Sequence, residues 1–323
     1  MDMKPGVWLV SLTLVLLSAS PAFAQQEAEQ VAQSDGERWY DFMSTALNEQ
    51  NFEASLVYVL GERIEPYHWL HAVEPNGEQL ELIVQMNGPG FRALRIGDKV
   101  SHFHPAARDY SLRANSINHL IPPAFSEKFE KIQSYYRVVA VGGARVLDRK
   151  AQHIRLISKH DNRFGFSVWV DRDSGMPLKV MMINEDGIPV EQVQMTSLAL
   201  RQDPSPLLEE LKRLSMPPLI QVTTNSQQMQ RSLRPLWHPE GFKLVEQKHH
   251  QLAVDNTPVD HYLYTDGLTE YSVYIAPRDA EQTGAMSVVG SQNLYTEPRN
   301  DVIITVVGQI PIQTAKRIVA EVQ

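Results

Sequence analysis

The sequence predicts a mainly β protein of the α+β class, in which a large N-terminal antiparallel sheet lies over helices and a smaller C-terminal α+β domain follows. Three observations predict this class. Short runs of alternating apolar and polar residues follow one another closely, helical periodicity is confined to a few stretches, and the composition changes after Asp203. A chain of 323 residues is also longer than one hydrophobic core usually supports, which favours two domains.

Residues 1–24 are typical of a cleavable secretory signal. Lys4 lies in a short polar start, an apolar core covers residues 7–17, and Ala22 and Ala24 form an A-x-A site that predicts cleavage before Gln25. The competing hypothesis is an uncleaved anchor, but the apolar run is about half of the roughly 20 residues that cross a bilayer. The chain has no cysteine, so neither lipidation at the cleavage site nor a disulfide is available. We expect a soluble, exported protein.

The large domain, residues 25–203, begins with a predicted helix. Ser34 and Glu37 form a capping box, and apolar residues then recur at helical spacing as far as Gln50. Strands follow in quick succession with no helix between them, which predicts an antiparallel meander. These strands are predicted at residues 52–60, 65–73, 80–86, 91–96 and 99–104.

A second helix is predicted over residues 124–136, after Pro122 and Pro123 end the first group of strands. The clearest signal in the chain comes later, where two strands flank a turn that contains Gly175. The strands of this second half are predicted at residues 135–141, 144–147, 153–157, 164–170, 178–183 and 189–200.

A curved sheet over a few helices leaves apolar space between its layers, which is a common site for an apolar ligand. The apolar faces of the strands and of the second helix supply candidate residues for a lipid cavity. They are Phe52, Leu56, Tyr58, Leu82, Val84, Phe125, Phe129 and Val168. The alternative is that these side chains fill the space themselves, as in most protein interiors.

The net charge is −8, so the chain as a whole has no electrostatic attraction for nucleic acid or for an anionic membrane. An anionic ligand would need a local basic patch. The candidate lipid phosphate patch consists of Arg92, Arg95, Lys99, Arg108 and Arg113, and arginine suits phosphate because its planar donors can bond two oxygens at once. The alternative is an ordinary solvated strand face.

Residues 204–229 are predicted to form a short helix from Pro206 and a polar linker over residues 223–230. Residues 230–323 then form a smaller α+β domain, which ends in a helix after Pro311. Its strands are predicted at residues 242–247, 261–265, 270–275, 286–294 and 302–307.

Motifs for catalysis and for metal binding are missing from the sequence. There is no GxSxG, HExxH or Walker loop, and the histidine pairs at 68 and 71 and at 102 and 104 are too few to make a metal site by themselves. We therefore expect no enzyme activity, no metal and no cofactor.

Six features of the chain carry a resemblance to a known family. They are the signal peptide, the capped helix that contains Trp39, WVDRDSGMPLK at residues 169–179, the proline-flanked linker, RPLWHPEGF at 234–242 and DGLTEYSVYIAP at 266–277. Together they resemble the RseB/MucB family of periplasmic regulators of sigma-E (AlgU), over essentially the whole mature chain. Carriers of the LolA and LppX type share the strand-turn-strand pattern of residues 169–179, but they lack the small domain that follows it here.

The resemblance implies a periplasmic protein whose large domain is a LolA/LppX-like unclosed β-barrel over helices. It also implies that the small domain binds the periplasmic part of the anti-sigma factor RseA/MucA. Such a complex shields the anti-sigma factor from DegS-type site-1 proteolysis, and lipopolysaccharide, a related lipid or a mislocalised lipoprotein releases it. The competing hypothesis is a LolA-like carrier of lipids or lipoproteins, which would not need residues 230–323.

Aromatic residues of the small domain are the candidates for anti-sigma binding, because aromatic side chains are common anchors in interfaces. They are inferred from residue type and position, and some of them must lie in the core of the domain. The set is Trp237, Phe242, Tyr262, Tyr264, Tyr271 and Tyr274. The sequence leaves open the identity of the lipid and whether the protein forms a homo-oligomer.

Overall fold

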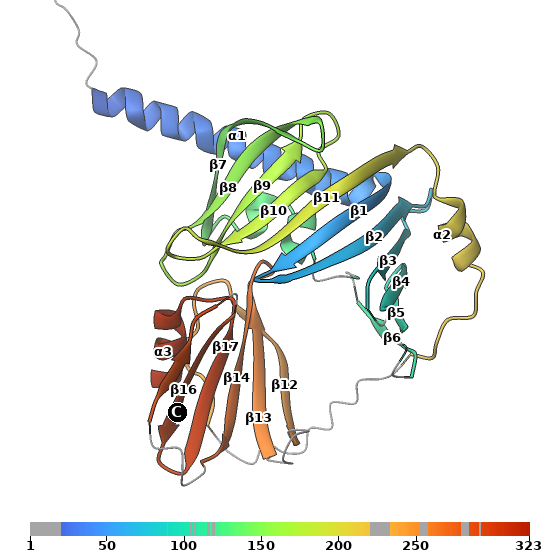
Figure 1. The fold of residues 1–323 in the computed structure, drawn as a ribbon. Helices are drawn as coiled ribbons and strands as arrows, with labels where there is room; N and C mark the ends of the chain where they lie inside the picture. The colour runs from blue at the N-terminus through green and yellow to red at the C-terminus, as the bar shows by residue number, and fades with distance from the viewer. Residues whose placement is uncertain are drawn as a thin grey trace, which may run out of the picture.

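Two antiparallel sheets dominate the structure, a computed structural model that describes residues 21–88, 90–103, 105, 108–114, 117, 120–219, 233–251, 258–278, 284–290 and 292–323. An eleven-stranded sheet forms the large domain and a six-stranded sheet forms the small one (Figure 1). This arrangement confirms the predicted fold class. Across these described ranges, we find no helix with the length and apolar composition of a membrane span.

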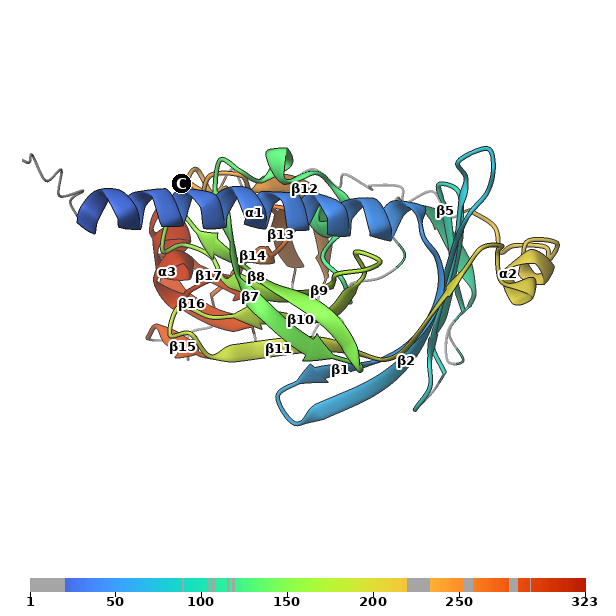
Figure 2. The ribbon, with the colours of Figure 1, turned by 90° about the horizontal axis from the view of Figure 1, so that it is seen from above.

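The large sheet is strongly curved, with helix α1 (Pro21–Glu49) on its concave side, and it does not close into a barrel (Figure 2). Its strand order is β6-β5-β4-β3-β2-β1-β11-β10-β9-β8-β7, so β6 and β7 are its two edges. Its elements are β1 (Asn51–Leu60), β2 (Arg63–Val73), β3 (Gln79–Gln85), β4 (Arg92–Ile96), β5 (Lys99–Phe103), β6 (Tyr110–Arg113), β7 (Tyr136–Val146), β8 (Arg149–Ser158), β9 (Gly165–Asp171), β10 (Pro177–Ile183) and β11 (Pro189–Arg201). The sequence did not predict β6, and it divided β7 into two strands.

Helix α1 (Pro21–Glu49) runs across the concave face of the sheet and packs mainly on β7 (Figure 2). A Cβ atom at Gly36 would lie 2.7 Å from the carbonyl oxygen of Val138, so only glycine allows the helix to approach the strand this closely. The predicted helix start at Ser34 is wrong. The helix passes through Ser34, whose hydroxyl donates to the carbonyl of Val31, because the preceding residues are good helix formers.

The predicted second helix over residues 124–136 is also wrong. Only two 3₁₀ turns form there, η1 (Pro123–Ser126) and η2 (Phe129–Lys131). The amide of Phe129 donates to the Asp41 carboxylate (2.8 Å), and the carbonyl of Ala124 accepts a bond from the Tyr40 hydroxyl (2.5 Å). The amide of Phe129, which an α-helix would bond to the carbonyl of Phe125, therefore binds to α1 instead, and the α-helical ladder is interrupted there.

A short helix, α2 (Pro206–Leu211), packs on the opposite, outer face of the large sheet. Its Leu208 completes a second apolar cluster there, with Leu70, Ala72, Leu80, Leu82 and Leu94. The chain then returns to the sheet edge, where the amide of Ser111 donates to the carbonyl of Pro218 (3.0 Å). Much of the segment predicted as helix and linker therefore packs on the large domain, while residues 223–230 lie outside the described residues.

The small sheet has the strand order β12-β13-β14-β17-β16-β15, and helix α3 (Ile312–Ala320) packs on β16 and β17. The predicted strand at residues 286–294 is a hairpin of two strands. The strands are β12 (Lys243–Gln251), β13 (Pro258–Thr265), β14 (Glu270–Pro277), β15 (Met286–Val288), β16 (Asn293–Arg299) and β17 (Val302–Gly308). Its core lies between the sheet and α3, where Val273, Ile304, Val306 and Ile318 are fully buried.

Candidate functional site

The two domains meet where the turn between β13 and β14, residues 265–270, enters the large domain. Asp266 closes this turn by accepting the amides of Leu268 (2.9 Å) and Thr269 (2.8 Å) with one carboxylate oxygen. Leu268 is buried in the hydrophobic core of the large domain rather than in that of its own domain. The turn is therefore a plug, and we call residues 265–270 the plug below.

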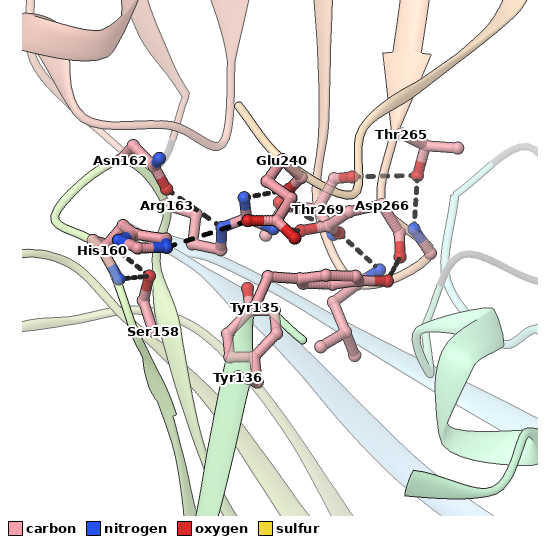
Figure 3. A network of polar contacts seen from close by, with 12 residues as sticks. Tyr135, Tyr136, Ser158, His160, Asn162, Arg163, Glu240, Thr265, Asp266 and Thr269 are labelled. Atoms are coloured by element: carbon pink, nitrogen blue, oxygen red, sulfur yellow. Dashed lines mark hydrogen bonds and ion pairs between the residues drawn. The ribbon is translucent and has the colours of Figure 1, made fainter. Parts of the chain in front are cut away.

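The second carboxylate oxygen of Asp266 binds Arg163, which lies between β8 and β9 of the large domain (Figure 3). The distance is 2.8 Å and both side chains are fully buried. The same guanidinium also donates to the carbonyl of Glu240 and lies 4.7 Å from the ring centre of Tyr135 and 5.1 Å from that of Phe242. Arg163 thus binds the small domain at three points from a site without water access.

Two glycines allow the close approach of the domains. Gly241 and Gly267 both have φ of +89°, which favours glycine. A Cβ atom at Gly241 would lie 2.5 Å from the ring of Tyr135, and one at Gly267 would lie 3.2 Å from the Cβ of Ala124. The carbonyl of Gly267 accepts the amide of Ala124 (3.0 Å), so the plug also bonds to η1.

A pocket of about 510 Å³ opens at the end of the concave face, between the C-terminal end of α1 and the turn η1. The lining of this pocket is mixed in character. It contains apolar side chains such as Leu47, Trp69 and Ile121, and ionisable ones such as His71, Glu81 and Arg95. A volume of this size fits a small ligand or part of a larger one.

Glu81 and His71 are the two buried ionisable groups that line this pocket. Glu81 carries the larger consequence for the pH dependence. It accepts a hydrogen bond from the Trp69 indole (2.8 Å) and lies 3.6 Å from the Arg95 guanidinium. Burial raises the pKa of Glu81 to about 7, although the positive charge of Arg95 opposes the shift. Burial has the opposite effect on His71 and lowers its pKa to about 4, so this imidazole is neutral near pH 7.

The raised pKa of Glu81 predicts a stability that falls as the pH rises. The neutral carboxyl stabilises the fold fully below about 4.5, its ordinary pKa, and this contribution is lost as the pH rises through 7. Between pH 4.5 and 7, Glu81 should lower the free energy of unfolding by at most about 1.4 kcal/mol for each pH unit. We expect Glu81→Gln to remove this dependence. Urea unfolding of the two proteins at several pH values measures the free energy of unfolding as a function of pH.

The lowered pKa of His71 makes the free energy of unfolding rise with pH below pH 6.5, but this contribution is the same in both proteins. Glu62→Gln, in an exposed turn, is the control, and identical pH profiles for Glu81→Gln and the unsubstituted protein would contradict the assignment.

The structure brings together some of the residues predicted to line a lipid cavity. Phe52, Leu56, Phe125, Phe129 and Val168 are buried together in the large core, packed with residues of α1, and Tyr58 lies at the edge of this core. These side chains occupy the space between the layers themselves.

Leu82 and Val84 do not belong to this group. They lie on the outer face of the sheet, in or beside the cluster that α2 covers, because on β3 it is Ile83 that points to the concave side. Placing them in the cavity was wrong.

The predicted phosphate patch is also divided between two faces. Arg92 and Arg95 are three residues apart on β4, so their side chains point to opposite faces. Arg95 lies in the pocket beside Glu81, and Arg113 forms an exposed ion pair with Asp98. Arg92 and Arg108 are exposed, and Lys99 is half-buried beside Arg113 in the ladder. The five residues therefore do not form one basic surface.

Most of the aromatic residues predicted to contact an anti-sigma factor form the core of the small domain. Phe242, Tyr262, Tyr264 and Tyr271 are buried there, and the last two rings stack with centres 5.1 Å apart. Trp237 is half-buried under the guanidinium of Arg317 (3.8 Å). Tyr274 is half-buried on the other face of the sheet, where its ring stacks on His261 with centres 4.5 Å apart.

Sequence reasoning did not identify Arg163 and Asp266, although they lie at the centre of the domain junction. They are 103 positions apart, so no local spacing connects them. One signal was present in the Asp-Gly-Leu-Thr turn at residues 266–269, where an aspartate capping its own turn predicts a fixed loop.

Comparison with known proteins agrees with this two-domain architecture. The family models described as the MucB/RseB N-terminal and C-terminal domains match residues 35–220 and 227–323. The sigma-E factor regulatory protein RseB of Escherichia coli (strain K12) is 30% identical over 282 residues, which cover 87% of this chain and 88% of that protein. The sigma factor AlgU regulatory protein MucB of Pseudomonas aeruginosa is 26% identical over 319 residues, which cover 97% of this chain and 96% of that protein.

A solved structure is also similar. In the complex of Pseudomonas aeruginosa MucA/MucB, a chain with 25% identity superposes with a TM-score of 0.71, and the match covers 90% of this chain and 98% of that chain. The chain belongs to the MucB/RseB family.

Proposed function

We propose that this chain is a periplasmic regulatory protein that binds the periplasmic segment of an anti-sigma factor, shields it from site-1 proteolysis and so restrains the sigma-E response. The observation that carries the proposal is the match of both family domains along one chain. The relatives are named as regulators of sigma-E or of AlgU, and one solved relative is a complex of MucB with MucA.

The geometry favours a binding protein over a carrier of lipids or lipoproteins. The apolar residues predicted to line a cavity are packed against α1, and the pocket of about 510 Å³ has several charged groups in its lining. A carrier also has no use for a small domain fixed to the large one by a buried ion pair. Release by lipopolysaccharide or another acylated ligand remains part of the proposal, with the pocket as its entry point.

Tyr274 is the aromatic candidate best placed to contact a partner without serving the core. It lies on the face of the small sheet opposite to α3, among the half-buried side chains of Leu263, Ser272, Thr305 and Val307. A partner segment that is disordered when free can lay an apolar stripe on such a face and become ordered as it binds.

We expect Tyr274→Ala to weaken binding of the anti-sigma segment at least about tenfold, because truncating an aromatic hot spot costs at least about 2 kcal/mol of binding energy and each 1.4 kcal/mol is a factor of ten. Biolayer interferometry with the immobilised segment measures the loss. Tyr110→Ala is the matched control, since Tyr110 is also a half-buried tyrosine stacked on a histidine, His102, but lies on the large sheet. Equal affinities for the two variants would remove this face from the binding site.

The proposed function itself is tested with the mature chain, residues 25–323, and the periplasmic segment of the anti-sigma factor from the same organism. We expect a saturable complex of defined stoichiometry in calorimetry. Binding of acylated lipid with no binding of the segment would contradict the proposal and support the carrier hypothesis instead.

A further inference from the structure

A second polar contact joins the two domains beside the plug. The side-chain amide of Gln309 donates to the carboxylate of Glu191 (3.2 Å). Glu191 lies on β11 of the large sheet, and Gln309 lies between β17 and α3 of the small domain. The hydroxyl of Tyr58 on β1 lies beside the same carboxylate and interacts with it, so Glu191 has a polar neighbour in each domain.

The backbone on both sides of this contact is fixed within its own domain. Glu191 is paired with Leu60 of β1 and with Met182 of β10, so it lies in the interior of the large sheet. The backbone amide of Gln309 donates to the carbonyl of Glu270 at the start of β14 (2.9 Å). The contact therefore connects two fixed parts of the molecule, and its strength affects how firmly the small domain is docked.

The junction is an unfavourable place for a negative charge on Glu191. This side chain is half-buried, and the charged group of the small domain that acts on it is a second carboxylate, Glu270. Burial, with a smaller contribution from the charge of Glu270, raises the pKa of Glu191 to about 7, although hydrogen bonds from Tyr58 and Gln309 oppose the shift. Glu191 thus changes its charge near neutral pH.

The other titratable groups around this contact keep their charge near pH 7. On the side of the large sheet, Tyr58 has Tyr67 and Arg63 of β2 as neighbours, and burial raises the pKa of both phenols, so they stay neutral. The cation of Arg63 is already paired with Glu65 (2.5 Å). In the plug, burial raises the pKa of Asp266 as well, and its buried ion pair contributes a pH dependence of the same sign.

We infer that the contact between Glu191 and Gln309 makes the docking of the two domains depend on pH, holding the small domain more firmly when the Glu191 carboxyl is protonated than when it is ionised. Undocking exposes Glu191 to water and returns its pKa towards the ordinary value of 4.5. The contribution of the protonated carboxyl to docking is therefore fully present below pH 4.5 and is lost as the pH rises through 7. The inference concerns the two domains of this chain and does not depend on the proposed function.

Amide exchange in the plug, followed by mass spectrometry, measures the population of the undocked state. The quantity to compare is the protection factor, which is the intrinsic exchange rate at each pH divided by the observed rate. Each unit of pKa shift is about a factor of ten in the undocking equilibrium, so we expect protection at residues 265–270 to fall at least about tenfold between about pH 5 and pH 8.

Glu191→Gln tests the assignment, because glutamine is a neutral mimic of the protonated carboxyl and can still accept the hydrogen bond from Gln309. The fall in protection should be at least about tenfold smaller in this variant than in the unsubstituted protein. The contribution of Asp266 is present in both proteins and cancels in the comparison.

Glu81→Gln is the matched control, since burial also raises the pKa of Glu81 to about 7 but this residue lies in a pocket that is lined by the large domain alone. It should leave the pH dependence of exchange in the plug unchanged. An equal fall in protection in Glu191→Gln and in the unsubstituted protein would overturn the inference. Loss of the pH dependence in Glu81→Gln would also overturn it, because exchange in the plug would then follow unfolding of the large domain and not undocking.

Discussion

Arg163→Met is expected to destabilise the protein by about 3–5 kcal/mol, because it leaves the Asp266 carboxylate buried without its cation. Methionine has a similar length and keeps much of the packing against Tyr135 and Phe242, so the loss is mainly electrostatic. Urea unfolding of the mature chain measures the change in the free energy of unfolding. Small-angle scattering of the folded variant should show a larger radius of gyration as the small domain undocks.

The double variant Arg163→Met with Asp266→Asn should recover part of the lost stability, since it removes both buried charges together. Arg113→Met is the control. It breaks the ion pair with Asp98, in which both side chains are largely exposed, and should cost less than about 1 kcal/mol. Equal effects of Arg163→Met and Arg113→Met would show that the buried pair does not hold the domains together.

Phe125→Ala is expected to cost about 3–5 kcal/mol, the usual range for removing a buried aromatic side chain. Phe125 is fully buried and packs edge-to-face on Tyr40 of α1 and on Phe166 of β9. Its loss leaves a cavity between the helix and the sheet that neither neighbour can close. Thermal and urea unfolding report the loss of stability.

Val141→Ala serves as the comparison, because Val141 is an apolar residue on the edge strand β7 whose side chain is exposed. Its effect should stay within about 0.5 kcal/mol. A small effect of Phe125→Ala would mean that the interior is loosely filled, and the lipid-cavity hypothesis would then gain support.

The alternation of apolar residues predicted most strands but not which layer covers each face. On β1 the pattern of Phe52, Ala54 and Leu56 is buried against the main core, as expected. On β3 the equally clear pattern of Leu80 and Leu82 is buried on the other side, under α2. Alternation of apolar and polar residues shows that one face of a strand is apolar, but not what packs on it. For β3 the packing partner is α2, which begins more than 120 positions later in the chain.

The predicted helix at residues 124–136 was wrong for a similar reason. Its apolar spacing is real, since Phe125, Phe129 and Ile132 are all buried. The spacing cannot show that Asp41 of α1 binds the amide of Phe129 and interrupts the helix. Tertiary hydrogen bonds of this kind override local preference.

The candidate sites were harder to predict than the fold. Residue type made Tyr262, Tyr264 and Tyr271 look available for a partner, but the small domain needs them for its own core. Arg163 binds Asp266 at the domain junction, but no motif in the sequence around it marks it as a contact residue. Contacts between distant segments depend on the packing of whole domains, and this information is not contained in spacing along the chain.

The central claim, that this chain shields an anti-sigma factor, is tested most directly by a time course of site-1 proteolysis on the isolated periplasmic segment. With the mature chain present at about ten times its Kd, roughly nine tenths of the segment is bound, so cleavage should slow about tenfold. Cleavage that proceeds at the same rate with and without the chain, at concentrations where binding is measured, would contradict the claim.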